Sequence, residues 1–359
     1  MSASTRQLHD LGQSLWLDNI TRTMLGDGTL RGYIDDLDVT GLTSNPTIFE
    51  KAVTGGDAYD RQIIESEAPS PEELFFELAL TDLREAADLF ADVHERTEGV
   101  DGWASLEVSP LLADDADATV EQARHLHELA ERDNLFIKIP GTQAGLQAIE
   151  ESIFAGVPIN VTLLFSTDQY LDAADAYMRG IERRIDAGLD PNVTSVASLF
   201  ISRWDRAVAD KVPDELRNQL GIAVAKRTYR AYRSLLLSVR WQHLANQGAR
   251  PQRLLWASTG TKDPDASDVL YIEALAAPQT IDTMPEETLH AFADHGKVQD
   301  PLAADGEDAE EVLAKFSAAG IDVSALAAQL QEEGKEAFDA SWKDLLDSIS
   351  SEHRRLTRA

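Results

Sequence analysis

The feature of this sequence that most constrains its fold is a regular alternation of short apolar runs with longer amphipathic segments. The apolar runs are rich in β-branched residues and have the length of buried strands, whereas the segments between them have helical periodicity. Such alternation is typical of βαβ units, in which helices join parallel strands. Eight runs predict strands, at residues 15–20, 39–45, 103–109, 135–140, 159–165, 193–201, 253–259 and 279–284.

The segments between these runs predict helices, which cover residues 71–97, 114–133, 142–154, 167–188 and 214–246. The first has a clear start, because Ser70 can cap it and Pro71 takes its first position. Eight strands with intervening helices predict an α/β fold, the closed (β/α)8 TIM-type barrel. An open doubly wound sheet is the alternative. It usually carries a glycine-rich nucleotide turn after its first strand, and this sequence has none there.

The strand pattern ends near residue 300. Residues 300–306 predict a turn, and residues 307–319 and 322–352 predict two helices. We therefore expect one domain over residues 1–359, in which residues 300–359 form a C-terminal helical extension that packs on the barrel.

The composition excludes several classes of protein. The chain has no cysteine, which rules out disulfides, thiolate catalysis and cysteine-ligated zinc. No run approaches the roughly 18 apolar residues of a membrane span, and no signal-peptide pattern opens the chain, so we expect a cytoplasmic protein without a membrane partner. With 32 basic and 63 acidic residues the net charge is −31, which argues against a nucleic-acid partner. Mutual repulsion favours a monomer, but an apolar helix face would also allow a homodimer.

Polar side chains lie near the carboxyl ends of most predicted strands. In a (β/α)8 barrel these ends converge on one face, and that face holds the active site. Charged groups inside apolar runs are costly unless they are paired or functional. The residues that follow this pattern are Asp18, Asn45, Glu107, Lys138, Asn160, Thr162, Ser198, Arg203 and Ser258.

Lys138 is the most informative of these residues, because apolar neighbours flank it on both sides in the run LFIKIP. Apolar surroundings disfavour an ammonium group, and only a neutral amine attacks a carbonyl carbon. The run therefore predicts an imine-forming nucleophile, for which Asp18 and Glu107 are the acid–base candidates. The alternative is structural: Lys138 could neutralise Asp18 or Glu107 as a buried ion pair.

Seven motifs of the chain resemble those of the transaldolases, in particular the longer branch of the family that is common in actinobacteria. The resemblance covers about residues 10–345, and TSNPT and NVTLLFS, on either side of the lysine, are its most specific parts. The motifs are LWLDNI (15–20), GLTSNPTIF (41–49), SLEVS (105–109), IKIPGT (137–142), INVTLLFS (159–166), SLFISR (198–203) and WASTGTK (256–262).

The resemblance implies an enzyme of the non-oxidative pentose phosphate pathway that needs no metal or organic cofactor. Such an enzyme transfers a dihydroxyacetone unit from sedoheptulose 7-phosphate to glyceraldehyde 3-phosphate, giving erythrose 4-phosphate and fructose 6-phosphate. Lys138 would form a Schiff base with C2 of the ketose. Glu107 would shuttle protons through a water molecule held by Thr162, and Asp18 would take the proton of the C4 hydroxyl.

The resemblance also implies a set of substrate-binding residues: Asn45, Asn160, Ser198, Phe200, Arg203 and Ser258. Among them, the two asparagines would hold donor hydroxyls and the arginine would bind the phosphate. One position departs from the family. Many transaldolases carry an arginine two positions after the serine of the Ala-Ser motif, where this chain has Gly260. Lys262 is the expected substitute, although the ammonium group of a lysine is a point charge, whereas the guanidinium group of an arginine is a planar fork of donors.

Three other functions stay open at this point. A short aldolase of the same superfamily would use the same lysine to release free dihydroxyacetone, but the 359 residues of this chain favour transfer. A metal-dependent barrel enzyme would need Asp18 and Glu107 as ligands, yet none of the eight histidines lies in a predicted strand. A non-catalytic binding protein is the third, and it leaves Lys138 and both carboxylates without a purpose.

Overall fold

The eight predicted strands form one parallel sheet that curls into a barrel. The computed structural model describes residues 3–298 and 300–357. The strand order is β2-β1-β8-β7-β6-β5-β4-β3, which matches a (β/α)8 barrel opened between its second and third strands. The strands are β1 (Ser14–Asp18), β2 (Val39–Thr43), β3 (Ala104–Glu107), β4 (Leu135–Pro140), β5 (Ile159–Leu164), β6 (Ser195–Phe200), β7 (Arg253–Ala257) and β8 (Thr280–Met284).

The two end strands of this order meet and close the barrel. Gly41 of β2 pairs in parallel with Trp103, directly before β3. The backbone N–H of Leu42 donates to the Trp103 carbonyl at 2.9 Å, and that of Gly102 donates to the Thr40 carbonyl at 2.8 Å. The predicted TIM-type fold is therefore confirmed.

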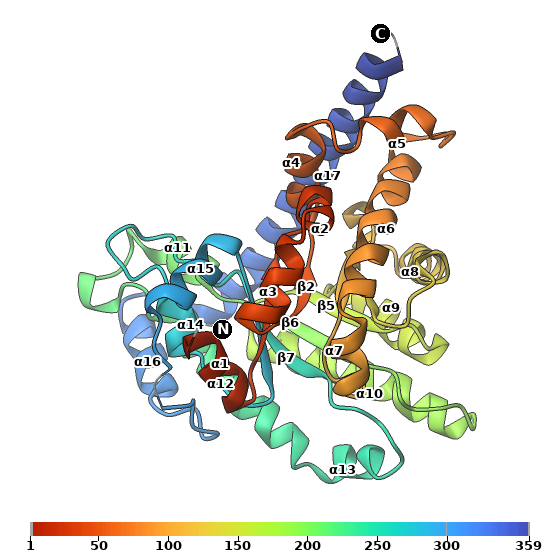
Figure 1. Ribbon diagram of the computed structural model, residues 1–359. Coiled ribbons are helices and arrows are strands. Elements are labelled where there is room, and N and C mark those ends of the chain that lie inside the picture. Colours follow the sequence, from red (N-terminus) through yellow and green to blue (C-terminus); the bar gives the residue numbers. More distant parts are fainter. Residues whose placement is uncertain (1–2, 299, 358–359) are drawn as a thin grey trace.

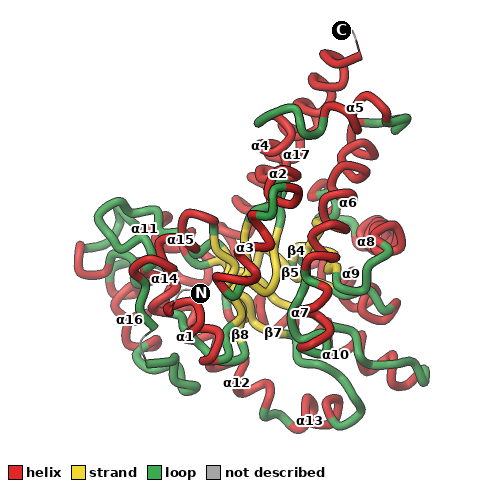
Figure 2. The backbone as a smooth tube through the Cα atoms, viewed as in Figure 1, coloured by secondary structure: helices red, strands yellow, loops and turns green. Residues whose placement is uncertain are grey.

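Helices surround the barrel on all sides (Figures 1 and 2). None of those in the described residues is long and apolar enough to cross a membrane. They are α1 (Ala3–Leu11), α2 (Arg22–Gly26), α3 (Thr29–Leu37), α4 (Pro46–Thr54), α5 (Asp60–Glu65), α6 (Pro71–Leu89), α7 (Ala91–Arg96), α8 (Ala116–Ala130), α9 (Gln143–Ala155), α10 (Thr167–Asp186), α11 (Ser202–Val208), α12 (Leu220–Leu236), α13 (Val239–Ala245), α14 (Leu270–Ala274), α15 (Glu286–His295), α16 (Ala309–Ala318) and α17 (Val323–Thr357).

Two predicted helices are interrupted in the structure. The segment 71–97 is α6 and α7, separated at the buried Phe90, and its predicted cap is confirmed, since the Ser70 hydroxyl accepts the Glu73 N–H at 3.2 Å. The segment 214–246 is a short 3-10 turn followed by α12 and α13, because Ser238 begins a new helix by capping it. The helices that the sequence analysis did not name, α1–α5, α11, α14 and α15, have at most 10 residues each, too few for a clear period.

The additional C-terminal helices are also confirmed. α16 packs beside α12, where Arg227 and Arg230 pair with Glu310. α17 is a single helix of 35 residues that contacts α4, α5, α6 and β5, and Figure 1 shows it rising past α4. Trp342 of α17 is fully buried, with its ring centroid 5.0 Å from that of Phe75 in α6. This packing carries α17 across the carboxyl ends of the strands.

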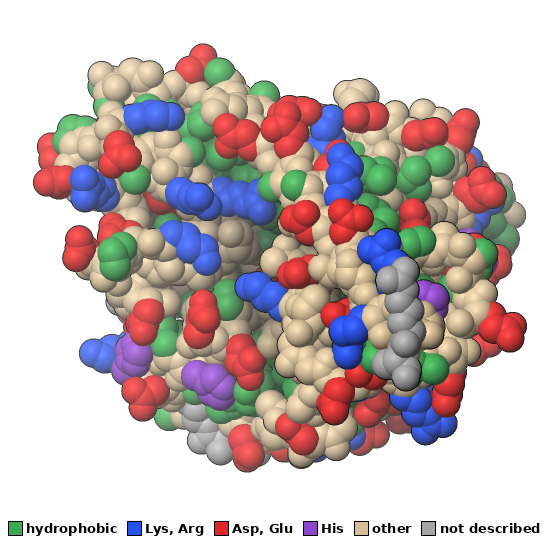
Figure 3. Space-filling view, turned by 90° about the horizontal axis from the view of Figure 1, so that it is seen from above, with side chains coloured by type: hydrophobic (Ala, Val, Ile, Leu, Met, Phe, Trp, Pro, Cys, Tyr) green, Lys and Arg blue, Asp and Glu red, His purple; other side chains and the backbone are tan. Residues whose placement is uncertain are grey.

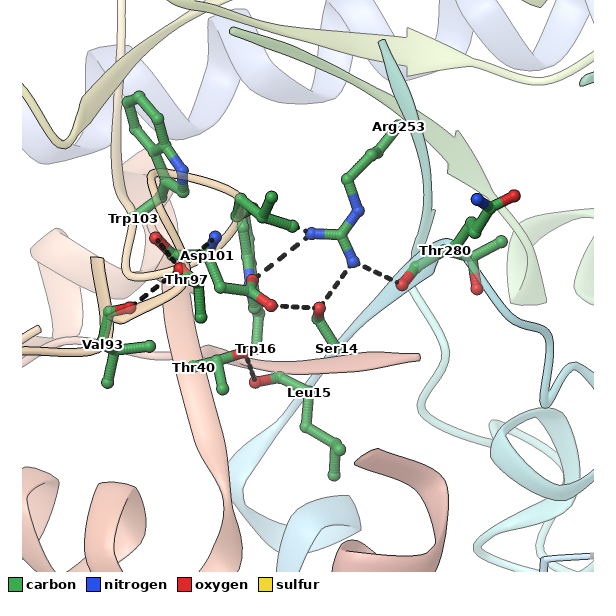
Figure 4. Close-up of polar contacts among 12 residues, drawn as sticks. Ser14, Leu15, Trp16, Thr40, Val93, Thr97, Asp101, Trp103, Arg253 and Thr280 are labelled. Carbon is green, nitrogen blue, oxygen red and sulfur yellow. Dashed lines mark hydrogen bonds and ion pairs between the residues drawn. The ribbon is translucent and has the colours of Figure 1, made fainter. Parts of the chain in front are cut away.

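A buried polar network fills the barrel at the amino ends of the strands (Figure 4). Its centre is Arg253 of β7, which donates to the Thr280 carbonyl at 2.9 Å and lies 3.4 Å from the carboxylate of Asp101. That carboxylate also accepts hydrogen bonds from the Ser14 hydroxyl and, at 2.9 Å, from Nε1 of Trp16. All five residues are buried. The network forms the floor of the barrel.

Aromatic rings form the next layer above this floor. Trp103 stacks on Phe136 with ring centroids 4.0 Å apart, and Trp16 lies 6.1 Å from the same ring. The interior is thus filled from below up to the level of these rings. The polar side chains of the predicted site lie on the other side of them, at the carboxyl ends of the strands.

Candidate active site

A cavity of about 380 Å³ opens at the carboxyl ends of the strands. Figure 3 looks onto this upper face and shows Lys and Arg side chains around a hollow. Glu107 and Asn160 lie behind the lining residues. Nine of the predicted site residues line the cavity: Asp18, Asn45, Lys138, Thr162, Ser198, Phe200, Arg203, Ser258 and Lys262.

Lys138 reaches the cavity because strand alternation points it into the barrel from β4. Its Nζ donates to the Ser44 carbonyl at 3.0 Å and to Oε2 of Glu107 at 3.3 Å. Glu107 is its direct neighbour in register on β3, and both side chains are less than a tenth exposed. The ion pair expected from the structural alternative is therefore present, yet Lys138 also lines the cavity.

The two acidic candidates are both partly shielded from water. Asp18 ends β1, and its Oδ1 accepts a hydrogen bond from the Thr43 hydroxyl at 2.8 Å. Burial raises the pKa of Asp18, against the opposing effects of the Lys138 charge and the Thr43 hydrogen bond. Burial likewise raises the pKa of Glu107, and the Lys138 charge again opposes it. Both carboxyl groups therefore hold a proton at higher pH than a free carboxylate does.

Three neutral polar residues complete this part of the wall. The Ser198 hydroxyl donates to Oδ1 of Asn160 at 2.7 Å, so the asparagine lies behind the serine and orients it. Direct contact of Asn160 with a substrate stays a prediction. Thr162 is 1% exposed, and its hydroxyl has no hydrogen-bond partner in the described part of the chain. A buried hydroxyl in this situation is suited to binding a water molecule or a substrate oxygen.

Asn45 is held by its own helix. It caps α4, with Oδ1 accepting the Ile48 N–H at 3.1 Å and Pro46 at the first helical position. Its carbonyl oxygen is thus engaged, and its amide NH2 group is the part available to donate to a ligand.

Three basic side chains besides Lys138 line the cavity: Arg203, Lys262 and Lys51. Arg203, on α11, packs its guanidinium against the rings of Phe200 and Phe338, with centroids 5.0 and 6.0 Å away. Burial lowers the pKa of Arg203, and the charge of Arg206 adds to the effect. Among the residues that the structure describes, none of the three lies within 4.0 Å of a carboxylate oxygen. In a chain with a net charge of −31, three basic side chains without a carboxylate partner in one cavity are suited to binding an anion.

Comparison with known proteins identifies the family of this chain. The family model described as Transaldolase/Fructose-6-phosphate aldolase matches residues 15–349. The chain belongs to the transaldolase family. The family that the motifs predicted is thereby confirmed, and the match extends from the first strand into α17.

Individual relatives agree with this assignment to the transaldolases. A protein named Transaldolase from Arthrobacter sp. (strain FB24) is 43% identical over 360 aligned residues, which cover 97% of each chain. Transaldolases from Frankia alni and from Thermobifida fusca (strain YX) are 42% and 43% identical over 363 aligned residues, covering at least 98% of each chain. The chain is thus an enzyme of the transaldolase type.

The departure from the usual transaldolase pattern has a structural counterpart at Gly260. A Cβ atom on Gly260 would lie 3.4 Å from Nζ of Lys262. The ammonium group of Lys262 therefore lies next to the position at which a side chain of residue 260 would begin. Ser258, the serine of the motif, has a left-handed backbone (φ 56°), and its hydroxyl is 3.0 Å from that of Ser202.

The residues of the cavity lining that sequence reasoning missed include Thr43, Lys51, Thr283 and Phe338. Thr43 and Lys51 lie inside or just after the motif that contains Asn45, so a search of that segment for polar side chains would have found them. Phe338 gives no such signal, because α17 reaches the site only through tertiary packing. No three His, Asp or Glu side chains among residues 3–298 and 300–357 gather to hold a metal ion.

Proposed function

We propose that this enzyme transfers a dihydroxyacetone unit from sedoheptulose 7-phosphate to glyceraldehyde 3-phosphate through a Schiff base on Lys138. The products are erythrose 4-phosphate and fructose 6-phosphate, as in the non-oxidative pentose phosphate pathway. One observation carries the proposal: the amine of Lys138 shares a cavity with the three unpaired cations Arg203, Lys262 and Lys51. An amine nucleophile beside anion-binding groups suits a carbonyl substrate that bears a phosphate.

The first half of the proposed reaction builds the imine. Nζ of Lys138 attacks C2 of the ketose, and the former carbonyl oxygen leaves as water. Glu107 supports this step, because its Oε2 lies 3.3 Å from Nζ and can take a proton from the amine and return it to the departing oxygen. The unpartnered Thr162 hydroxyl is placed to hold the water molecule through which this proton moves.

The second half breaks and remakes a carbon–carbon bond. Asp18 takes the proton of the C4 hydroxyl, C4 becomes a carbonyl carbon, and the electrons of the C3–C4 bond move into the imine. The aldose phosphate leaves, and a three-carbon enamine stays on Lys138. The acceptor aldehyde then adds to C3 by the reverse of these steps, and water releases the new ketose. The raised pKa of Asp18 fits a group that accepts and returns a proton in each cycle.

Borohydride trapping tests this proposal. The enzyme is reduced in the presence of fructose 6-phosphate, digested and mapped by mass spectrometry, with Lys138→Met as the control. We expect a reduced three-carbon adduct on the peptide with Lys138 and none in the variant. An adduct on a different lysine, or no adduct in folded enzyme, would show that the Schiff-base assignment is wrong.

Transfer and simple cleavage differ in the molecule that reacts with the enzyme-bound enamine: an acceptor aldehyde in transfer, and water after protonation in simple cleavage. A fructose 6-phosphate aldolase releases dihydroxyacetone without an acceptor, whereas a transaldolase needs an aldose phosphate. The relatives of matching length are named transaldolases, which favours transfer. The rate of fructose 6-phosphate consumption with and without erythrose 4-phosphate separates the two: a rate that does not depend on the acceptor would favour the aldolase.

The partners in this proposal are sugar phosphates alone, with no nucleic acid and no membrane. Sugar phosphates are charged and do not cross a bilayer unaided, so the proposed activity places the enzyme with its substrates in the cytoplasm. Cell fractionation checks this location. Monomer and homodimer both stay predictions, and light scattering on the purified enzyme distinguishes them.

A further inference from the structure

One stripe of α17 faces the candidate active site. Gln331, Gly334 and Phe338 are spaced three and four residues apart, so they lie on the same side of the helix. Phe338 lines the cavity, and a Cβ atom on Gly334 would lie 3.0 Å from Leu163 and 3.2 Å from Arg203. Gln331 makes the polar contacts of the stripe: its Nε2 donates to the carbonyl oxygens of Gly141 and Leu163, each at 3.0 Å.

These two carbonyls belong to the strand ends that present the reacting groups. Gly141 directly follows β4, three residues after Lys138, and Leu163 directly follows Thr162 in β5. The two ends are also tied together, since the Gly141 N–H donates to the Thr162 carbonyl at 2.8 Å. One amide group of α17 therefore holds both strand ends at once.

Leu163 needs such support because its backbone is unusual. Its φ is 59°, a left-handed conformation that is uncommon for residues other than glycine. The pairing of β5 with β6 also shifts register between Val161 and Leu164, around this residue. A strained residue persists when its surroundings hold it in place, and the amide of Gln331 binds the carbonyl of that very residue.

We propose that Gln331 is a positioning residue for the transfer reaction. By holding the Leu163 and Gly141 carbonyls, it fixes the backbone turn after Thr162 and keeps the buried Thr162 hydroxyl in the cavity beside Lys138. The assignment rests on the proposed function, in which Thr162 holds the water used to form the imine. It gives α17 a part in the chemical step, separate from the contact of Phe338 with Arg203.

The test compares Gln331→Leu with Gln329→Leu as a matched control. Gln329 is on the same helix, and its Nε2 bonds Glu333 on the exposed side. We expect Gln331→Leu to lower kcat, and the rate of borohydride-trapped adduct formation, by roughly 10- to 100-fold, since a small displacement of a reacting group costs up to about that much. KM for fructose 6-phosphate should stay within about twofold, because the aromatic contacts of Arg203 are untouched. Gln329→Leu should match the parent enzyme.

A second variant, Gln331→Glu, separates hydrogen bonding from bulk. An ionised carboxylate only accepts, so it cannot bind the two carbonyls, whereas a protonated carboxyl group donates to one of them. The kcat of Gln331→Glu relative to the parent enzyme should therefore rise as the pH falls from 8 to 5.5. The same ratio for Gln331→Leu should stay flat. If Gln331→Leu fails to fold, this pH series alone tests whether the hydrogen bonds of Gln331 position the active site.

The outcomes are distinguishable from one another. If the parent enzyme gives no adduct on Lys138, the proposed function is wrong and the assignment of Gln331 goes with it. If the parent enzyme gives the adduct and Gln331→Leu keeps its kcat, only the assignment of Gln331 is overturned. The assignment of Gln331 would also be overturned if Gln329→Leu lost as much kcat as Gln331→Leu. It would likewise be overturned if the kcat of Gln331→Glu relative to the parent enzyme did not depend on pH, because Gln331 would then only contribute to packing.

Discussion

The polar floor of the barrel predicts that Asp101→Ala destabilises the fold and leaves catalysis intact. Arg253 is 8% exposed, and the Asp101 carboxylate is its ion-pair partner at 3.4 Å. Removal of one partner of a buried ion pair leaves an uncompensated charge and costs about 3–5 kcal/mol. Trp16 and Ser14 lose an acceptor in the same variant, which keeps the expected cost in the upper part of that range. A typical domain is stable by about 5–15 kcal/mol, so the loss is large.

The double variant Asp101→Ala/Arg253→Met tests the cause. It removes both charges, so the cost of an unpaired guanidinium disappears. We expect the double variant to be more stable than Asp101→Ala, although below the parent enzyme, since Trp16 and Ser14 remain without their acceptor.

Urea unfolding followed by tryptophan fluorescence is the assay, because Trp16 belongs to the network and Trp103 lies in the aromatic layer directly above it. The kcat of each variant is measured in parallel without urea. A cost below about 1 kcal/mol for Asp101→Ala, or further destabilisation in the double variant, would refute the reasoning from uncompensated charge. A reduced kcat at unchanged stability would contradict the separation of floor and active site.

Three more predictions concern the site and its supports. Burial raises the pKa of Asp282 to about 7, and Thr259 donates to its Oδ1 at 2.8 Å; the folded state therefore binds this proton more tightly than the unfolded chain. The contribution of Asp282 to the free energy of unfolding should therefore decline as the pH rises from about 4 through 7. Urea unfolding at pH 5 and at pH 8 should show a smaller decrease in the free energy of unfolding for Asp282→Asn than for the parent enzyme. Arg203→Ala should raise KM for phosphorylated donors by roughly 10- to 100-fold, with little effect on unphosphorylated dihydroxyacetone; an equal loss for both would contradict phosphate binding. Gly334→Ala would place a methyl group 3.0 Å from Leu163 and 3.2 Å from Arg203, so it should displace the Arg203 guanidinium and raise the same KM several-fold in initial-rate kinetics. An unchanged KM would mean that α17 shifts away instead.

The strands, and the charged residues that the structure brings together at their carboxyl ends, were predictable from the sequence because their signals are local. An apolar run with one lysine specifies both a buried strand and a costly charge within it, so Lys138 stands out without any tertiary information. Asp18 and Glu107 follow by the same reasoning. The convergence of strand ends in a barrel then brings these three residues together.

The contribution of α17 was not predictable in this way. Its amphipathic pattern predicts a packed helix, but the partner of each face depends on how the helix crosses the barrel. Gln331 and Phe338 are ordinary helix residues in the sequence, and only the folded chain puts one against two strand ends and the other against Arg203. The break at Phe90 between α6 and α7 was not predicted from the sequence either, because the apolar pattern of the helix continues through this residue.

The place of α17 in the chain also sets the order in which the enzyme is assembled during translation. All eight strands precede it, because β8 ends at Met284 and α17 begins at Val323. At about 5–20 residues per second, the ribosome needs several seconds to pass from the end of the barrel to Phe338. During that interval the nascent barrel already carries Lys138 but lacks the α17 side chains, among them Phe338, that line the same cavity. The lining of the candidate site is therefore completed only when α17 docks on the barrel.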